Sequence, residues 1–170
     1  HPPCTYLSVS GARWMYHPDD GHLPIKERRR HPKHPNRKEQ QKEALDFVQA
    51  LMDAPIPRIA IENPVSVISS KIRKSDQTIQ PYHFGDEATK TTCLWLKNLP
   101  KLVPTKIVGK GEFVDFKSGK KMSKWYYELS RLPHKERGIA RSKTFPGIAK
   151  AVANQWGTLS SFQKNLFDIT

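Results

Sequence analysis

Cysteine is scarce in this sequence, and long apolar runs are missing. Two cysteines among 170 residues, Cys4 and Cys93, are too few for a disulfide framework and favour a reducing intracellular compartment. No stretch approaches the roughly 20 apolar residues that a membrane span needs, and the first residues lack the charged-then-apolar pattern of a signal peptide. The sequence therefore predicts a cytoplasmic protein that is not associated with a membrane.

Acidic side chains are also few. The chain has 16 Asp and Glu against 29 Lys and Arg, which leaves a formal charge of +13. A hydrophobic content of 36%, with 16 aromatic residues, is enough to build a core and excludes wholesale disorder. Three basic runs, at residues 26–30, 71–74 and 117–124, carry much of the positive charge. This excess predicts a polyanionic partner, with nucleic acid ahead of an anionic membrane surface.

Apolar periodicity predicts one long helix and two short strands. Over residues 37–52 apolar side chains recur every three to four positions, with Asn36 as the expected N-cap and Pro55 as the stop. The run 58–62 is short, rich in isoleucine and ends in an acid, which is typical of a buried parallel strand, and residues 91–96 form a second strand candidate. A helix followed by such a strand is half of an α/β repeat. We therefore predict a three-layer α/β fold with a mostly parallel sheet.

The remaining patterns are less specific. His31 and His34 lack the paired cysteines of a zinc site, so we expect a solvated surface there and no metal site. The single Gly-x-Gly, within residues 108–111, precedes alternating residues rather than a helix, which indicates a hairpin turn. Two terminal helices are expected at residues 146–156 and 160–167.

Two motifs carry a resemblance to a known family. The string PCTYLSVSG at residues 3–11 resembles the catalytic loop of cytosine-5 DNA methyltransferases, which reads Pro-Cys-Gln-x-Phe-Ser-x-x-Gly. The string IENP at residues 61–64 resembles their Glu-Asn-Val motif. Together with the TTCLWL and TFPGIA segments, these motifs make the chain most similar to small phage-type methylase-like proteins of that family. The resemblance covers most of the chain and implies a sheet of the Rossmann-like methyltransferase type.

The resemblance implies covalent chemistry on a cytosine base. Carbon 5 of cytosine becomes nucleophilic once a thiolate has added to carbon 6, and Cys4 is the implied nucleophile. Glu62 is implied as the general acid at N3. A base within duplex DNA has to be flipped out of the helix to reach these groups. The residues implied to bind substrate or support the loop are Ser8, Arg13, Asn63 and Lys90.

The resemblance also implies S-adenosylmethionine as the methyl donor, with Pro3, Thr144 and Gly147 as cofactor-binding residues. The family's glycine-rich cofactor turn should precede the Cys loop, and nothing in this sequence corresponds to it. The sequence also opens on His1, without an initiator Met. We therefore expect the catalytic half of a methyltransferase with an incomplete sheet. A second chain or a missing N-terminal half would complete its cofactor site.

Three regions are expected along the chain. Residues 1–96 would form the catalytic core, residues 97–140 a small basic target-recognition insertion, and residues 141–170 helices that complete the core. The sequence departs from the family at Thr5, where the family has Gln, and at Pro64, where it has Val, and the family's Gln-x-Arg-x-Arg motif is absent. The alternative interpretation is a non-enzymatic nucleic-acid-binding remnant, or one subunit of a split methyltransferase.

Overall fold

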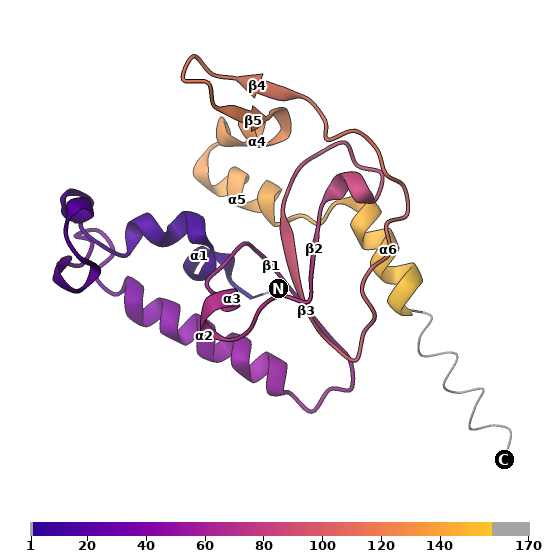
Figure 1. Ribbon diagram of the computed structural model, residues 1–170, viewed down its shortest axis with the longest axis horizontal. Helices are drawn as coiled ribbons and strands as arrows, with labels where there is room; N and C mark the ends of the chain where they lie inside the picture. The colour runs from indigo at the N-terminus through magenta and orange to yellow at the C-terminus, as the bar shows by residue number, and fades with distance from the viewer. Residues whose placement is uncertain (1, 158–170) are drawn as a thin grey trace, which may run out of the picture. The chain divides into compact units, whose positions relative to one another are not determined.

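The computed structural model describes residues 2–157, which form two compact units (Figure 1). Unit 1 takes in the described residues up to 78 together with residues 92–99, and unit 2 takes in residues 79–91 and the described residues from 100 onward. No helix in this described part is long and apolar enough to cross a membrane. The terminal helix expected at residues 160–167 lies outside the described residues.

Unit 1 is built on a small antiparallel sheet, so the predicted parallel sheet of the Rossmann-like methyltransferase type is wrong. Its three strands lie in the order β1-β3-β2 and comprise β1 (Ile59–Pro64), β2 (Gln77–Ile79) and β3 (Thr92–Lys97). Ile59 lies opposite Lys97 and Pro64 opposite Thr92, so β1 and β3 run in opposite directions. The only other sheet among the described residues is a two-stranded antiparallel hairpin in unit 2.

The side-chain pattern of β1 explains why the parallel assignment fails. Ile61 and Asn63 are buried, whereas Ala60 is exposed and Glu62 is half-buried. This alternation is typical of a strand with one covered face, since the strands of parallel sheets are covered on both faces and are apolar throughout. The only α-helix between β1 and β3 is α3 (Ile68–Lys71), which is too short for the helical crossover of a parallel pair.

The predicted long helix is confirmed as α2 (Arg37–Asp53). Its apolar repeat buries Ala44 and Val48 against the rest of unit 1, while charged residues occupy its exposed side. Asn36 stands at the N-cap position, but its side chain makes no capping hydrogen bond. The helix ends at Asp53, before Pro55, because proline cannot continue a helix.

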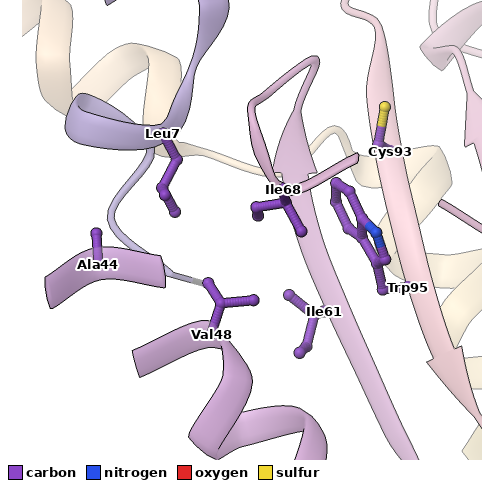
Figure 2. Close-up of a cluster of buried hydrophobic side chains, with 7 residues drawn as sticks. All are labelled: Leu7, Ala44, Val48, Ile61, Ile68, Cys93 and Trp95. Carbon is purple, nitrogen blue, oxygen red and sulfur yellow. The ribbon is translucent and has the colours of Figure 1, made fainter. Parts of the chain in front are cut away.

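Figure 2 shows the hydrophobic core of unit 1, to which two strands and three helices contribute. Val48 and Ile68 are fully buried, and the large ring of Trp95 is 1% exposed. The indole N–H of Trp95 donates to the carbonyl of Arg73 at 2.8 Å, so its one polar atom is satisfied. The core side chains are Leu7, Ala44, Val48, Ile61, Ile68, Cys93 and Trp95. Cys93 packs here as the buried small residue expected from its place in a strand.

Before α2 the chain forms short helical turns rather than an open loop. These are α1 (Cys4–Leu7) and three 3-10 turns, η1 (Val9–Trp14), η2 (Pro18–His22) and η3 (Ile25–Glu27). This part of the chain contains buried polar residues, since Asp20 is 2% exposed and His31 is 6% exposed.

Unit 2 combines a hairpin with three helices. Its elements are η4 (Pro81–His83), β4 (Phe113–Asp115), β5 (Lys121–Ser123), α4 (Lys124–Ser130), α5 (His134–Ser142) and α6 (Pro146–Gly157). The hairpin turn lies at residues 116–120, where Gly119 takes a positive φ of 75°, and not at residues 108–111 as expected. The predicted helix over residues 146–156 is confirmed as α6. The side chain of Gln155 connects α6 with the loop that contains Val103. Its amide donates to the Val103 carbonyl and accepts from the Val103 N–H, both at 2.8 Å.

Truncating Leu7 to Ala tests the packing of unit 1. Leu7 is 0% exposed, so Leu7→Ala should lower the free energy of unfolding by about 2–5 kcal/mol through lost burial and a residual cavity. Val9→Ala, two residues away and 52% exposed, should change it by less than about 0.5 kcal/mol. Urea unfolding followed by tryptophan fluorescence measures both values. Equal effects of the two substitutions would contradict this packing.

Candidate functional site

The Cys4 segment pairs with the chain that follows β1. The backbone N–H of Val9 donates to the carbonyl of Val65 at 3.1 Å, and the N–H of Val67 donates to the carbonyl of Leu7 at 2.9 Å. These two bonds flank an isolated antiparallel bridge. The first motif therefore lies directly against the end of the strand that carries the second, although about 60 residues separate Cys4 from that strand in the sequence.

Asn63 makes a second connection between the two motifs. It is 1% exposed, and its side-chain Nδ2 donates to the carbonyl of Pro2 at 3.2 Å. Its Oδ1 has no hydrogen-bond partner among the described residues, and the same is true of the buried hydroxyl of Ser66. Buried polar atoms without partners are uncommon, and these two lie at the junction of the Cys4 segment with the end of β1.

Helix α2 holds the backbone around Cys4. The Arg37 guanidinium donates to the carbonyl of Thr5 and lies 4.8 Å from the centre of the Tyr6 ring, and the Gln41 amide donates to the carbonyl of Tyr6 at 2.9 Å. Cys4 itself begins α1 and its thiol is exposed and free. The result is an accessible thiol on a short segment whose backbone is fixed by buried partners.

The sequence reasoning missed Arg37 and Gln41, although the sequence holds a signal for them. They precede Ala44 and Val48 at spacings of three or four residues, on the stripe of α2 that is buried. A polar residue on an apolar stripe needs a partner within the protein. Here the partners are the carbonyls of the Cys4 segment.

The other candidate residues of unit 1 lie on nearby elements. Glu62 is half-buried and stands opposite Leu94 in the register of β1 and β3. Because side chains alternate along a strand, Glu62 points to the face opposite Ile61 and Asn63. The hydroxyl of Ser8 lies 3.0 Å from that of Ser10, within hydrogen-bond distance.

Arg13 is exposed, and its guanidinium carbon lies 5.0 Å from the centre of the Trp14 ring. Pro3 is exposed at the N-cap position of α1. Cys4, Ser8, Arg13, Asn63 and Glu62 therefore all belong to unit 1.

Lys90 belongs to unit 2 and takes part in its internal structure. Its ammonium group donates to the carbonyls of Arg141 at 2.8 Å and Lys143 at 3.3 Å, at the end of α5. A lysine that binds the last carbonyls of a helix stabilises the helix C-terminus. The Lys90 ammonium thus binds the C-terminal end of α5 within unit 2, whereas Cys4 belongs to unit 1.

Gly147, one of the residues implied for S-adenosylmethionine, does not fit a cofactor contact in this structure. The backbone N–H of Gly147, at the start of α6, already donates to the carboxylate of Asp86 at 2.9 Å. A Cβ atom at Gly147 would lie 2.0 Å from the carbonyl oxygen of Phe84, so the space beside this backbone is filled by protein. Thr144 is exposed in unit 2, whereas Pro3 belongs to unit 1. We therefore derive no step through this cofactor.

Comparison with known proteins adds no relative. No protein-family model, curated protein or solved structure matches the chain. The resemblance to cytosine-5 DNA methyltransferases thus stays a hypothesis that rests on the residues quoted above. The site has to be interpreted from its own geometry and chemistry.

The basic run at residues 26–30 is largely occupied within its own loop. Arg28 donates to two backbone carbonyls of the preceding turn at 2.7 and 2.9 Å, and Arg30 pairs with Glu39 at 2.6 Å. Arg29 pairs with the buried Asp20 at 2.6 Å. Hydrogen bonds from the Arg29 side chain and backbone lower the pKa of Asp20 from 3.8 to about 2. These arginines hold the loop together, and their charge is partly neutralised there.

The expectation of a solvated histidine surface is wrong for His31. The rings of Trp14, His31 and His34 form a cluster with centre-to-centre distances of 5.1–5.2 Å. Burial lowers the pKa of His31, and electrostatic interactions with His34, His17 and Lys33 lower it further. No group of three or more metal-ligating side chains occurs among residues 2–157. The cluster is an aromatic contact that fixes η1 against the loop before α2.

Substituting Gly147 tests whether its backbone is packed against protein. Gly147→Ala should lower the free energy of unfolding by about 1–3 kcal/mol, because the new methyl group meets the fixed Phe84 carbonyl. Gly138→Ala is a matched control in α5, where nothing lies within 4 Å of the added Cβ, and should stabilise by about 0.5–1 kcal/mol. Thermal unfolding measures both. A stabilising Gly147→Ala substitution would refute the close approach.

The Asp20–Arg29 pair should make unit 1 sensitive to acid. Because the folded pKa of Asp20 is about 2 and its ordinary value is 3.8, its contribution to stability is complete above about pH 4 and is lost as pH falls toward 2. The difference in urea midpoint between the parent protein and Asp20→Asn should therefore shrink between pH 5 and pH 2. Asp19→Asn changes an exposed carboxylate and should show no such narrowing. A constant difference for Asp20→Asn across this range would exclude the pair as its cause.

Proposed function

We propose that the chain adds a cysteine thiolate to cytosine bases of DNA, the first chemical step of cytosine-5 methyltransferases. Cys4 is the nucleophile and Glu62 is the acid in this proposal. The observation that carries it is the backbone pairing of Val9 with Val65 and of Leu7 with Val67, which joins the two motif-bearing segments. This pairing fixes the backbone of the segment that bears Cys4 against the chain that follows Glu62, while the Glu62 side chain points to the face of β1 opposite Asn63.

The proposed step balances as follows. The Cys4 sulfur forms a bond to carbon 6, and the electron pair of the C5–C6 double bond moves into the C4–C5 bond. The C4–N3 pair moves onto N3, which takes the proton of the Glu62 carboxyl group. The product is an enamine whose carbon 5 is nucleophilic. Water can protonate this carbon and then accept the original hydrogen from it. Return of the N3 proton to the Glu62 carboxylate, with expulsion of the Cys4 thiolate, restores cytosine and the acid.

Two features of unit 1 and the charge of the whole chain support this proposal. The Cys4 thiol is exposed, so a flipped base can reach it. The carbonyls of Thr5 and Tyr6, the two residues after Cys4, accept hydrogen bonds from Arg37 and Gln41 of α2, which limits the motion of the nucleophile. The net charge of +13 favours contact with the phosphates of DNA.

Hydrogen exchange at carbon 5 tests the proposal without any methyl donor. DNA labelled with tritium at carbon 5 of cytosine should release tritium to water in the presence of the protein. Cys4→Ser should reduce release to the background, and Glu62→Gln should reduce it by about 10²–10⁴-fold because proton transfer to N3 is lost. Cys93→Ala is the matched control, since that buried thiol lies in the core and should not affect exchange. Release by Cys4→Ser at the parent rate would refute the assignment of Cys4.

The second candidate function is nucleic-acid binding without catalysis, either as a remnant or as a subunit of a split enzyme. It is favoured by the distribution of charge, since residues 101–143 hold 12 of the 29 Lys and Arg residues. Tritium release separates the two functions, because a pure binding protein gives none. If the parent chain binds DNA with a steep salt dependence and releases no tritium, this second function replaces the first.

A further inference from the structure

Positive charge is concentrated in one stretch of unit 2, residues 101–143, which we name the basic segment. It contains 12 Lys and Arg against four Asp and Glu, which leaves +8 of the chain's +13. The segment spans a loop, the β4–β5 hairpin, α4 and α5. Unlike the run at residues 26–30, it therefore keeps a large local excess of charge.

The excess of +8 already subtracts the two acids that form ion pairs within the basic segment. Lys124 pairs with Glu112 at 2.5 Å, and Lys121 lies 3.4 Å from Asp115. Both pairs are exposed and link neighbouring parts of the hairpin. Further lysines of the segment are exposed to solvent, namely Lys101, Lys106, Lys117, Lys120, Lys135 and Lys143.

The same segment exposes aromatic rings beside its cations. Phe113 is 44% exposed, and Tyr126 is 37% exposed with the Arg141 guanidinium 4.2 Å from its ring centre. In the β4–β5 register, Phe113 and Lys121 lie on one face of the hairpin, and Val114 lies on the other. Val114 and its partner Met122 are half-buried, whereas Phe113, Asp115 and Lys121 are exposed. The Phe113 face is therefore the outer one.

We infer that the basic segment binds the unpaired nucleotides of single-stranded nucleic acid. Bases stack on the exposed rings of Phe113 and Tyr126, and lysines at the hairpin turn bind the backbone phosphates. Flat rings set among cations are the arrangement that holds single strands without reading a sequence. In a duplex the base faces are already stacked on one another, so exposed rings would add nothing to phosphate contacts. This inference does not depend on the chemistry at Cys4.

An anionic membrane surface would call for a different arrangement. Peripheral binding uses a helix with one continuous apolar face flanked by lysines. The exposed apolar side chains of the basic segment do not share one helix face but are spread over a loop, the hairpin and two helices. They are Val103 and Ile107 before β4, Phe113 on β4, Phe116 in the hairpin turn, Tyr126 on α4 and Ile139 on α5. This distribution favours separate stacking contacts over insertion in a lipid layer.

Fluorescence anisotropy with labelled 20-mer oligo-dT tests the inference on the full chain. The parent protein and Cys4→Ser should bind it equally, and more tightly than a hairpin duplex of 20 base pairs. Phe113→Ser should weaken oligo-dT binding by about tenfold through the loss of one stacking platform. Ile139→Ser is the matched control, because it removes an exposed aliphatic side chain of the same segment. It should leave the affinity unchanged.

A charge series tests the phosphate contacts separately. The triple substitution Lys117→Gln, Lys120→Gln and Lys121→Gln should reduce the slope of log affinity against log salt by about 2, since each phosphate contact on a single strand contributes roughly 0.7. Lys33→Gln, Lys71→Gln and Lys74→Gln remove equal charge from exposed positions of unit 1 and should leave the slope nearly unchanged.

Three results would overturn the inference. They are equal binding of oligo-dT and duplex, an unchanged oligo-dT affinity for Phe113→Ser, and binding to phosphatidylserine vesicles without binding to oligo-dT. Failure of tritium release leaves this inference standing, because the binding assay gives the same result with Cys4→Ser. Failure of oligo-dT binding would not refute the proposed thiolate chemistry, which the tritium-release assay tests.

Discussion

Alternation of side chains along β1 is the constraint on which unit 1 depends. Ile61 and Asn63 must share one face of the strand, and that face is buried against α1, α2 and α3. Ile61 joins the apolar core, while Asn63 reaches the carbonyl of Pro2 and so holds the Cys4 segment. The residue between them, Glu62, is forced to the other face. Strand β1 therefore contributes Ile61 to the core and holds the Cys4 segment through Asn63. It directs the Glu62 carboxyl group to the opposite face.

The sequence predicted the elements of unit 1 better than their arrangement. A repeat of three to four residues located α2 to within a residue of its ends, because burial of one stripe determines such a helix. The isoleucines located the strand at residues 59–64, but they did not predict the direction of the strand that pairs with it. Short apolar runs are compatible with either strand direction. The exposed Ala60 and the half-buried Glu62 were the available sign of a one-sided, antiparallel sheet.

The net charge of a long segment indicates a binding surface for anions better than a short run of basic residues does. The three arginines at residues 28–30 look like a phosphate-binding patch, yet a buried aspartate, a glutamate and backbone carbonyls engage them. Asp20 lies nine residues from its partner Arg29, so no local sequence pattern predicts their ion pair. By contrast, residues 101–143 retain their excess because their acids are few. A surplus over all local acids cannot be neutralised by ion pairs within the segment, whereas a short run of arginines can be engaged by nearby carboxylates and carbonyls.

Gly147 shows that a sequence motif alone does not establish a cofactor contact. The string around it suggested a cofactor contact, but a backbone N–H has a single hydrogen to donate, and Asp86 accepts it. Asp86 lies 61 residues earlier in the chain, so only the fold reveals that the position is taken. The Cys4 segment differs, because its backbone carbonyls are occupied while its thiol is exposed. In unit 1 the structure therefore fixes the backbone beside an accessible thiol, and in unit 2 it fills the space beside the Gly147 backbone. Addition to carbon 6 needs only the open thiol and a proton donor, so this half of the chemistry does not depend on the position that is closed.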